Sequence, residues 1–333
     1  EMNERISSET GHNIAASTFH KLGLNIISQV NGVMPRITQI SLRKFVKEQL
    51  VLNMQSDTYL NLLSSYLLYN RVVAKSEFDF KSQKEYDEYL NLNPPTTVNN
   101  ETVKSYGEMD IANFLMQNGI QYIYEHPYEI DTRTSEYGQY HPDFYLPDYK
   151  IYIEYFGINR NGEVPSYFKA ANGMSATEAY RASMEWKRAT HREHQTTMIE
   201  CFAYEKLEGN LLDVLKEKLE AASVALTPKS SKELWTQVAA EGDSLLDGII
   251  ELFETLINLI KSNGYDIATV RNLNHTGSNT QANNILLSLL EPIFNAYCKY
   301  LADHKEIDFN DMINLASEYV RQGKYINPYK YVI

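Results

Sequence analysis

Residues 141–157 read HPDFYLPDYKIYIEYFG, and this stretch predicts a β-hairpin that turns at Leu146-Pro147-Asp148. Side chains alternate between the two faces of a strand, so Glu154 points to the same side as Tyr152 and Phe156. An unpaired carboxylate is costly to bury among such apolar neighbours. A metal ion, a cationic side chain or a proton must therefore compensate for Glu154.

A second carboxylate lies close to Glu154 in the predicted hairpin. Asp143 ends the first strand and Glu154 lies in the second, so the two side chains can converge on one point. Two carboxylates, helped by a main-chain carbonyl, suit Mg²⁺ or Mn²⁺. Such an ion polarises a phosphodiester and lowers the pKa of an attacking water. The hairpin therefore predicts a divalent metal site at Asp143 and Glu154.

The hairpin belongs to a segment, 101–222, whose pattern predicts an α/β unit with a mixed sheet and flanking helices. Its elements alternate in the order helix, three strands, helix, strand, helix. We expect a helix from Ser105 to Gly119, strands at 120–130, 140–145 and 150–157, a helix at Thr177–His194, a strand at Thr197–Tyr204 and a helix at Leu211–Ala222.

Mainly α-helical segments flank this unit, giving three predicted domains at 1–92, 101–222 and 223–333. The first flank has a helix start at Ser17-Thr18, and the second has helices near 245–260 and 285–301. The proline- and asparagine-containing stretch 91–100 has the composition of a linker. We expect the polar stretch 272–284 to be a mobile loop.

Charge and composition narrow the class of protein. A net charge of −12 argues against a broad nucleic-acid surface, although a local groove is compatible with it. No apolar run approaches the length that spans a bilayer, and no secretory signal opens the chain. Cys201 and Cys298 lie in apolar elements, which favours free thiols in a reducing compartment. We therefore expect a cytoplasmic protein without membrane contact.

The hairpin resembles the PD-(D/E)xK nucleases, which have the restriction-endonuclease-like fold. Pro142-Asp143 matches the PD, and Glu154-Tyr155-Phe156 matches the (D/E)xK. The resemblance implies metal-dependent hydrolysis of DNA, with a further acid on the preceding helix, where Glu108 is well placed. Phe156 departs from the pattern, because the family has lysine there. Some members supply that lysine from the next helix, which here makes Lys187 the candidate.

The helix predicted after the hairpin carries a stripe of polar side chains. Tyr180, Lys187, His191 and His194 fall at i, i+7, i+11 and i+14, on one helix face. In the nuclease interpretation Lys187 stabilises charge on the phosphate and Tyr180 contacts nucleic acid, while His191 contacts phosphate or helps in proton transfer. A solvated surface lysine and a packing histidine explain the same residues structurally. Glu125 and Glu200 also lie in strand-like runs, where pairing with a nearby Lys or Arg explains them.

Both ends of the chain resemble UvrD/Rep-type superfamily-1 DNA helicases. Residues 1–6 (EMNERI) are similar to the helix after motif Ia, and residues 17–22 (STFHKL) to the next DNA-contacting motif. Residues 307–313 (IDFNDMI) are similar to the "DF.DL" element, and residues 329–333 (YKYVI) to the strand before Walker B. The layout resembles helicase IV-like members. We expect a piece cut between motifs Ia and II, with the nuclease-like domain inserted.

The helicase resemblance implies single-strand contacts at Thr18 and His20. For Asp308 and Asp311 we prefer helix capping and surface pairing to any catalytic role. No G-x-x-x-x-G-K-[ST] occurs, so we expect ATP binding and unwinding only in the full-length helicase.

Three interpretations remain open from the sequence. The first is a Mg²⁺- or Mn²⁺-dependent deoxyribonuclease domain of a DNA helicase, acting in DNA repair, recombination or defence, with Glu108, Asp143, Glu154 and Lys187 as catalytic residues and single-stranded or forked DNA as partner. The second is an inactive nuclease fold that binds DNA or a partner protein, which Phe156 supports. The third keeps only the helicase, with the insert as a structural arm and exposed tyrosines stacking on bases.

Overall fold

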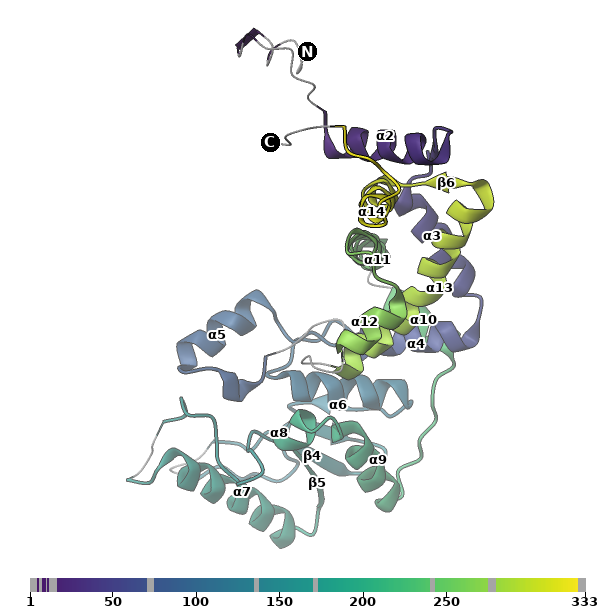
Figure 1. The fold of residues 1–333 in the computed structure, drawn as a ribbon. Helices are drawn as coiled ribbons and strands as arrows, with labels where there is room; N and C mark the ends of the chain where they lie inside the picture. Colours follow the sequence, from purple (N-terminus) through teal and green to yellow (C-terminus); the bar gives the residue numbers. More distant parts are fainter. Residues whose placement is uncertain are drawn as a thin grey trace. The chain divides into compact units, whose positions relative to one another are not determined.

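The computed structural model describes residues 17–70, 75–134, 138–169, 173–239, 243–274 and 280–328, with Arg5, Ser8, Glu9 and Gly11. The helicase-like residues 1–4, 6 and 329–333 lie outside this description. The chain forms two compact units (Figure 1), one of Glu1–Leu63 with Glu241–Ile333 and one of Ser64–Ala240. The division thus differs from the three predicted segments, because both sides of the 91–100 stretch belong to one unit.

The unit of residues 64–240 is built on a small mixed sheet. In its described part, four strands are ordered β2-β3-β4-β5. The pairings of β2 with β3 and of β3 with β4 are antiparallel, and β4 pairs with β5 in parallel. The strands are β2 (Ile123–Tyr124), β3 (Phe144–Leu146), β4 (Ile151–Phe156) and β5 (Thr197–Phe202).

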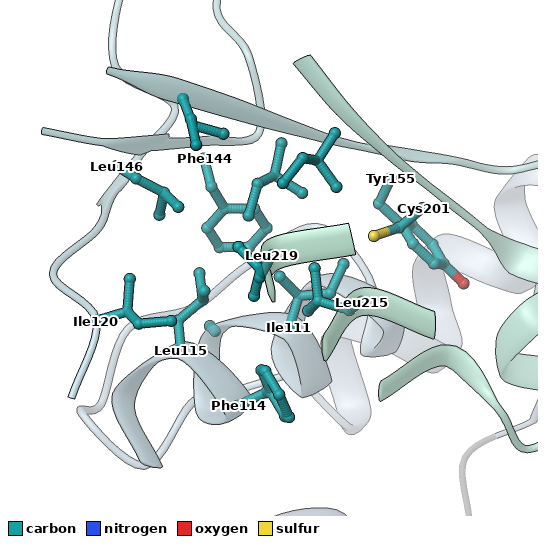
Figure 2. Packing of buried hydrophobic residues seen from close by; sticks show 14 of the residues in the cluster. Ile111, Phe114, Leu115, Ile120, Phe144, Leu146, Tyr155, Cys201, Leu215 and Leu219 are labelled. Carbon is teal, nitrogen blue, oxygen red and sulfur yellow. The ribbon is translucent and has the colours of Figure 1, made fainter. Parts of the chain in front are cut away.

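Helices α6 (Tyr106–Gln117) and α9 (Leu211–Ala221) cover one face of this sheet. Their buried side chains pack on the alternate strand residues that point to the same side, which are spaced by two as a strand requires. Figure 2 shows this core, which includes Ile111, Leu115, Phe144, Leu146, Tyr155, Cys201, Leu215 and Leu219.

Helix α7 (Ala176–Glu193) lies on the other face. There it meets Tyr152 and Phe156 of β4, through clusters that contain Trp186 and Met184. The result is a three-layer helix–sheet–helix arrangement, the predicted α/β unit with a mixed sheet and flanking helices. The remaining elements of this unit are η1 (Glu77–Asp79), α5 (Gln83–Leu92), α8 (Ala203–Leu207) and α10 (Ser231–Ala239).

Local sequence signals set the ends of α6 as predicted. The Ser105 hydroxyl accepts a hydrogen bond from the Glu108 N–H at 3.2 Å, which caps the first turn. The helix ends at Gln117 with Asn118 as its C-cap, and Gly119 follows with φ of 69°, a conformation that glycine adopts without strain.

The strand predicted over residues 120–130, before the hairpin, is shorter in the structure. Of the segment 120–130, only β2 is strand, because Glu125 adopts φ of 49° and turns the chain out of the sheet. Side chains then satisfy backbone groups beyond the sheet: the Gln139 amide donates to the Tyr128 and Ile130 carbonyls, and Thr132 Oγ1 accepts from the Tyr140 N–H. These side-chain bonds accompany the backbone bonds that continue beyond β2, such as that from the Tyr128 N–H to the Tyr140 carbonyl at 2.8 Å.

The other unit is mainly helical. Helices α2 and α14 pack through Ile26, Ile27 and Ala316, and two short parallel strands, β1 and β6, pair Arg36 with Glu306. Its elements are α2 (Phe19–Asn31), β1 (Arg36–Ile37), α3 (Leu42–Asn53), α4 (Asp57–Tyr69, whose C-terminal part belongs to the other unit), α11 (Asp243–Ser262), α12 (Ile267–Asn274), α13 (Thr280–His304), β6 (Glu306–Ile307) and α14 (Phe309–Arg321).

The prediction of a loop over residues 272–284 is wrong at both ends of this stretch, because both ends are helical. Helix α12 continues to Asn274 and α13 begins at Thr280. Asn274 bonds to Asn284 and to the Thr280 carbonyl through its side chain, so polar residues that favour loops instead join two helices. Of the helices that the structure describes, none combines the length and apolar character needed to cross a membrane.

Candidate active site

The sheet register places Asp143 beside Glu154. Phe144 pairs with Ile153 in the antiparallel ladder, so the next position outward sets Asp143 against Glu154. The two strands are also joined by a side chain, because Asp143 Oδ2 accepts a hydrogen bond from the Tyr155 N–H at 2.7 Å. The predicted pair of carboxylates is therefore brought together by the hairpin itself.

Glu154 is 1% exposed, and two side chains bind its carboxylate. Lys187 Nζ lies 2.5 Å from Oε2, and the Tyr140 hydroxyl donates to Oε1 at 2.6 Å. The charge of the central strand carboxylate is thus balanced by a cation from α7 and a hydroxyl from the loop before β3. Of the three compensations considered from the sequence, the structure has the cationic side chain.

Phe156 occupies the position where the nuclease pattern has lysine. Its side chain is buried with Ile158, Val164 and Met184. Lys187 Nζ lies 5.4 Å from the centre of the Phe156 ring, so the cation from α7 stands over the aromatic residue. The structure therefore brings Lys187 of α7 to the Glu154 carboxylate, beside the buried Phe156 ring.

Asp143 is half-buried, and its pKa is raised to about 7. Burial is the largest cause and the negative charge of Glu154 is the next, while Lys187 and the Tyr155 N–H act in the opposite direction. Asp143 therefore carries a proton for part of the time near neutral pH. A positive charge placed between Asp143 and Glu154 would relieve this repulsion.

Glu108 lies in the first turn of α6 and is buried. Its Oε2 accepts from the Tyr124 hydroxyl at 2.6 Å and the Lys104 N–H at 3.1 Å, and its Oε1 from the Ser105 hydroxyl at 2.9 Å. Burial, followed by the charge of Asp143, raises the pKa of Glu108 to about 7. The charge of Asp143 therefore acts on Glu108, and both oxygens of the Glu108 carboxylate already accept hydrogen bonds within the protein.

Tyr180 and His191 face the sheet from α7, as the helical spacing predicts. The Tyr180 hydroxyl accepts from the Gly157 N–H at 2.9 Å. His191 is 3% exposed, and its two ring nitrogens contact Tyr140 and Thr196. Burial, with the charge of Lys187, lowers the pKa of His191 to about 4. This placement does not fit the direct contact with nucleic acid predicted for His191, because apolar rings and polar partners enclose the imidazole.

Thr18 and His20 lie in the helical unit. Thr18 caps α2 by accepting from the Lys21 N–H at 3.2 Å, and the exposed His20 ring meets the Phe309 ring edge-to-face at 5.5 Å. Asp308 caps α14 as predicted, but its pairing is buried rather than superficial: Lys261 Nζ lies 2.9 Å from Asp308 and 3.0 Å from Asp311.

Glu125 and Glu200, the other two carboxylates of the predicted strand-like runs, are paired with cationic side chains as the sequence predicts. Arg188 binds Glu200 through two nitrogens, both at 2.7 Å, and Lys104 binds Glu125. Glu200 lies directly beside Glu154 in the parallel register. Two neighbouring strand carboxylates are therefore bound by two successive residues of α7, Lys187 and Arg188.

Tyr140 and Thr196 are the polar residues of this region that the sequence did not single out. Their contacts join positions 14 and 5 residues apart, across the hairpin and across the turn after α7. Tyr140 precedes the PD pair by two residues, which was the available signal, but many tyrosines share this part of the sequence.

The residues fit a divalent cation by their chemistry. Asp143, directly before β3, and Glu154 in β4 are hard oxygen donors, and burial followed by the negative charge of Glu154 raises the pKa of Asp143. Lys187 already binds Oε2 of Glu154, so an ion would share or compete for that oxygen. Within the described ranges, no group of three or more Asp, Glu, His or Cys side chains is arranged for a metal ion. The predicted site has only two such side chains, Asp143 and Glu154.

Comparison of the chain with protein-family models, curated proteins and solved structures gives no match in any of the three.

Proposed function

We propose that the unit of residues 64–240 is a metal-dependent nuclease domain with the restriction-endonuclease-like fold, acting on DNA. The observation that carries the proposal is the convergence of Asp143, Glu154 and Lys187, with Glu108 within electrostatic reach of Asp143. The element order helix, three strands, helix, strand supports it, because the sequence resemblance implies this order.

In this proposal Asp143 and Glu154 hold Mg²⁺ or Mn²⁺, which when bound polarises the phosphodiester and increases the acidity of a water. Lys187 stabilises negative charge on the phosphate, and its side chain is 23% exposed whereas that of Glu154 is 1% exposed. Glu108 assists directly or through a water; the charge of Asp143 contributes to the raised pKa of Glu108, and a cation bound at Asp143 would reduce that repulsion.

We also propose a function for the helical unit. The unit of residues 1–63 and 241–333 belongs to a superfamily-1 DNA helicase, in which ATP is bound by the full-length enzyme. Thr18 and His20 contact single-stranded DNA there. The support for this is the sequence resemblance, together with the exposed His20 and Phe309 rings at the ends of two helices.

A second candidate function is a nuclease-like module that binds DNA or a protein without cutting. The ion pair between Lys187 and Glu154 favours it, because the buried carboxylate is neutralised without a metal. The buried Phe156 in place of lysine favours it as well.

The deciding experiment compares the chain with Glu154→Gln and Glu200→Gln, each incubated with single- and double-stranded DNA and Mn²⁺ or Mg²⁺. Glu200 is a matched control because it is the register partner of Glu154 and also pairs with α7. A nuclease predicts cutting by the parent and by Glu200→Gln, and a loss of at least about 100-fold in Glu154→Gln. If the parent binds no Mn²⁺ and leaves DNA intact, the second function is the better description.

A further inference from the structure

A line of hydrogen-bonded side chains runs from the sheet face to Glu154. It contains Tyr128, Thr196, His191, Tyr140 and Glu154, which come from the loop before β3, from α7, from the turn after it and from β4. The Tyr128 and Thr196 hydroxyl oxygens are 2.6 Å apart, and Thr196 Oγ1 is 2.7 Å from His191 Nδ1. His191 Nε2 is 3.3 Å from the Tyr140 oxygen, which is 2.6 Å from Glu154 Oε1.

The direction of every bond follows from the carboxylate end. An ionised carboxylate only accepts, so the single Tyr140 proton goes to Glu154. The Tyr140 oxygen must then accept from His191, which requires the imidazole proton to be on Nε2. Nδ1 is therefore the acceptor for the Thr196 hydroxyl, and the Thr196 oxygen accepts from Tyr128.

The surroundings preserve this arrangement. His191 and Tyr140 are buried, and the His191 ring lies against the rings of Tyr128, Tyr140 and Tyr152 at 5.0 to 5.7 Å. The lowered pKa of His191, about 4, keeps the imidazole neutral at neutral pH, as a ring with one proton requires. Buried polar chains of this kind rigidify the groups at their ends when every member is satisfied.

We infer that Tyr140 and His191 are positioning residues that fix the rotation of the Glu154 carboxylate. Tyr140 occupies Oε1 and leaves Oε2 directed to Lys187 and to any bound cation. His191 acts through Tyr140, because it holds the hydroxyl oxygen as an acceptor and so aims its proton at Glu154. This inference deepens the proposed function and rests on it for the role of Oε2 as metal ligand.

The first measurement is the tautomer of His191 in the full chain, by long-range proton–nitrogen NMR with ¹⁵N-labelled histidine. His191→Gln assigns the signal. We expect the proton on Nε2 in the parent, and a mixture of tautomers in Tyr140→Phe, which removes the acceptor. Tyr145→Phe is the matched control, since Tyr145 belongs to the same aromatic cluster but its hydroxyl bonds to Glu129. It should leave the His191 signal unchanged.

The second measurement is Mn²⁺ affinity by calorimetry on the same proteins. Loss of a group that orients a metal ligand lowers affinity by roughly 10- to 100-fold. We expect such a loss in Tyr140→Phe and less than about a twofold change in Tyr145→Phe. If Tyr140→Phe fails to fold, Thr196→Val replaces it: this variant removes the donor to Nδ1 but leaves the bond between Tyr140 and Glu154 in place, so the proton should stay on Nε2. A mixture of tautomers in Thr196→Val would show that Thr196 rather than Tyr140 sets the tautomer, and would overturn the inference.

A proton on Nδ1 in the parent would overturn the inference, as would a Tyr140→Phe variant with the parent's tautomer and Mn²⁺ affinity. Failure of the proposed function has a different signature. In that case the parent binds no Mn²⁺, while the Nε2 tautomer and its loss in Tyr140→Phe still show that the two residues orient Glu154 toward Lys187.

Discussion

The pair of Lys187 and Glu154 dominates the electrostatics of the sheet face that meets α7. Breaking one side of a buried ion pair leaves an uncompensated charge, which typically costs about 3–5 kcal/mol. Lys187→Met should therefore lower the free energy of unfolding by that order, and adding Glu154→Gln should recover part of it. Chemical denaturation of the two single variants and the double variant measures the coupling.

The neighbouring pair is the control for this prediction. Arg188 and Glu200 join the same helix to the next strand, but their side chains are 33% and 23% exposed. Because water screens this pair, Arg188→Met should cost about 1 kcal/mol or less. If Lys187→Met and Arg188→Met lowered the free energy of unfolding equally, burial of Glu154 would not make its ion pair the stronger one.

The raised pKa values of Asp143 and Glu108 predict how stability depends on pH. Both carboxyls ionise near pH 7 in the folded protein and near pH 4 when unfolded, so the folded state binds more protons between these values. Stability should accordingly fall as pH rises from about 4 to about 7. Asp143→Asn removes one of the two groups and should raise stability at pH 7.5 relative to pH 4.5 by about 2 kcal/mol.

The measurement is guanidinium unfolding at both pH values in buffer with a chelator. Asp148→Asn is the control, because Asp148 is exposed in the turn of the same hairpin. The prediction would be contradicted if the stability of the parent rose with pH, or if Asp143→Asn and Asp148→Asn changed the pH dependence of stability equally. Either result would show that the surroundings of Asp143 do not raise its pKa. Added Mn²⁺ should reverse the trend if it binds at Asp143 and Glu154, since a bound cation lowers the pKa of Asp143.

At the scale of elements, the close approach of α6 to β4 depends on one glycine. A Cβ atom at Gly107 would lie 2.0 Å from the Tyr155 ring, in the core shown in Figure 2. Gly107→Ala gains helix propensity but forces the ring or the helix to move, and we expect a net loss of about 1–3 kcal/mol or more.

Gly248 in α11 is the counterpart for this test. It lies in a helix interior with nothing within 4 Å of an added Cβ, so Gly248→Ala should stabilise the chain by about 0.5–1 kcal/mol. Thermal or chemical unfolding of both variants gives opposite signs if the packing of α6 is as described. If Gly107→Ala stabilised the protein, the Tyr155 ring would have to move away from position 107 without a cost in packing energy.

Elements with strong local signals were predictable from the sequence. The cap at Ser105 and the glycine at 119 set α6, and the helical spacing of Tyr180, Lys187 and His191 placed all three toward the sheet. The short β2 was not predictable, because an apolar run does not reveal that Glu125 takes a left-handed conformation. The link from Tyr140 to His191 was not predictable either, since tertiary packing joins residues 51 positions apart.

At the scale of the whole molecule, the division into two units was not visible in the composition. The 91–100 stretch has linker residues, yet the Thr97 N–H bonds to the Glu101 carbonyl and Asn113 holds the Val98 N–H, so the segment is a structured turn on α6. The actual division falls within α4 at Leu63 and after α10 at Ala240, and neither carries a proline or glycine run. Contacts distant in sequence define such boundaries, and one sequence does not display them.

The α/β unit of residues 64–240 contains the residues that its fold and its candidate site need. Its core cluster, and all of Glu108, Asp143, Glu154 and Lys187, come from residues 64–240. A fragment of residues 57–240, which keeps α4 whole, should therefore unfold in one cooperative transition and retain the Mn²⁺ affinity of the full chain within about threefold. Circular dichroism and calorimetry check both properties, with the Glu154→Gln fragment as the binding control. A fragment that folds cooperatively but loses Mn²⁺ binding seen in the full chain would mean that the helical unit contributes to the site, whereas a fragment without a cooperative transition would mean that its core is incomplete.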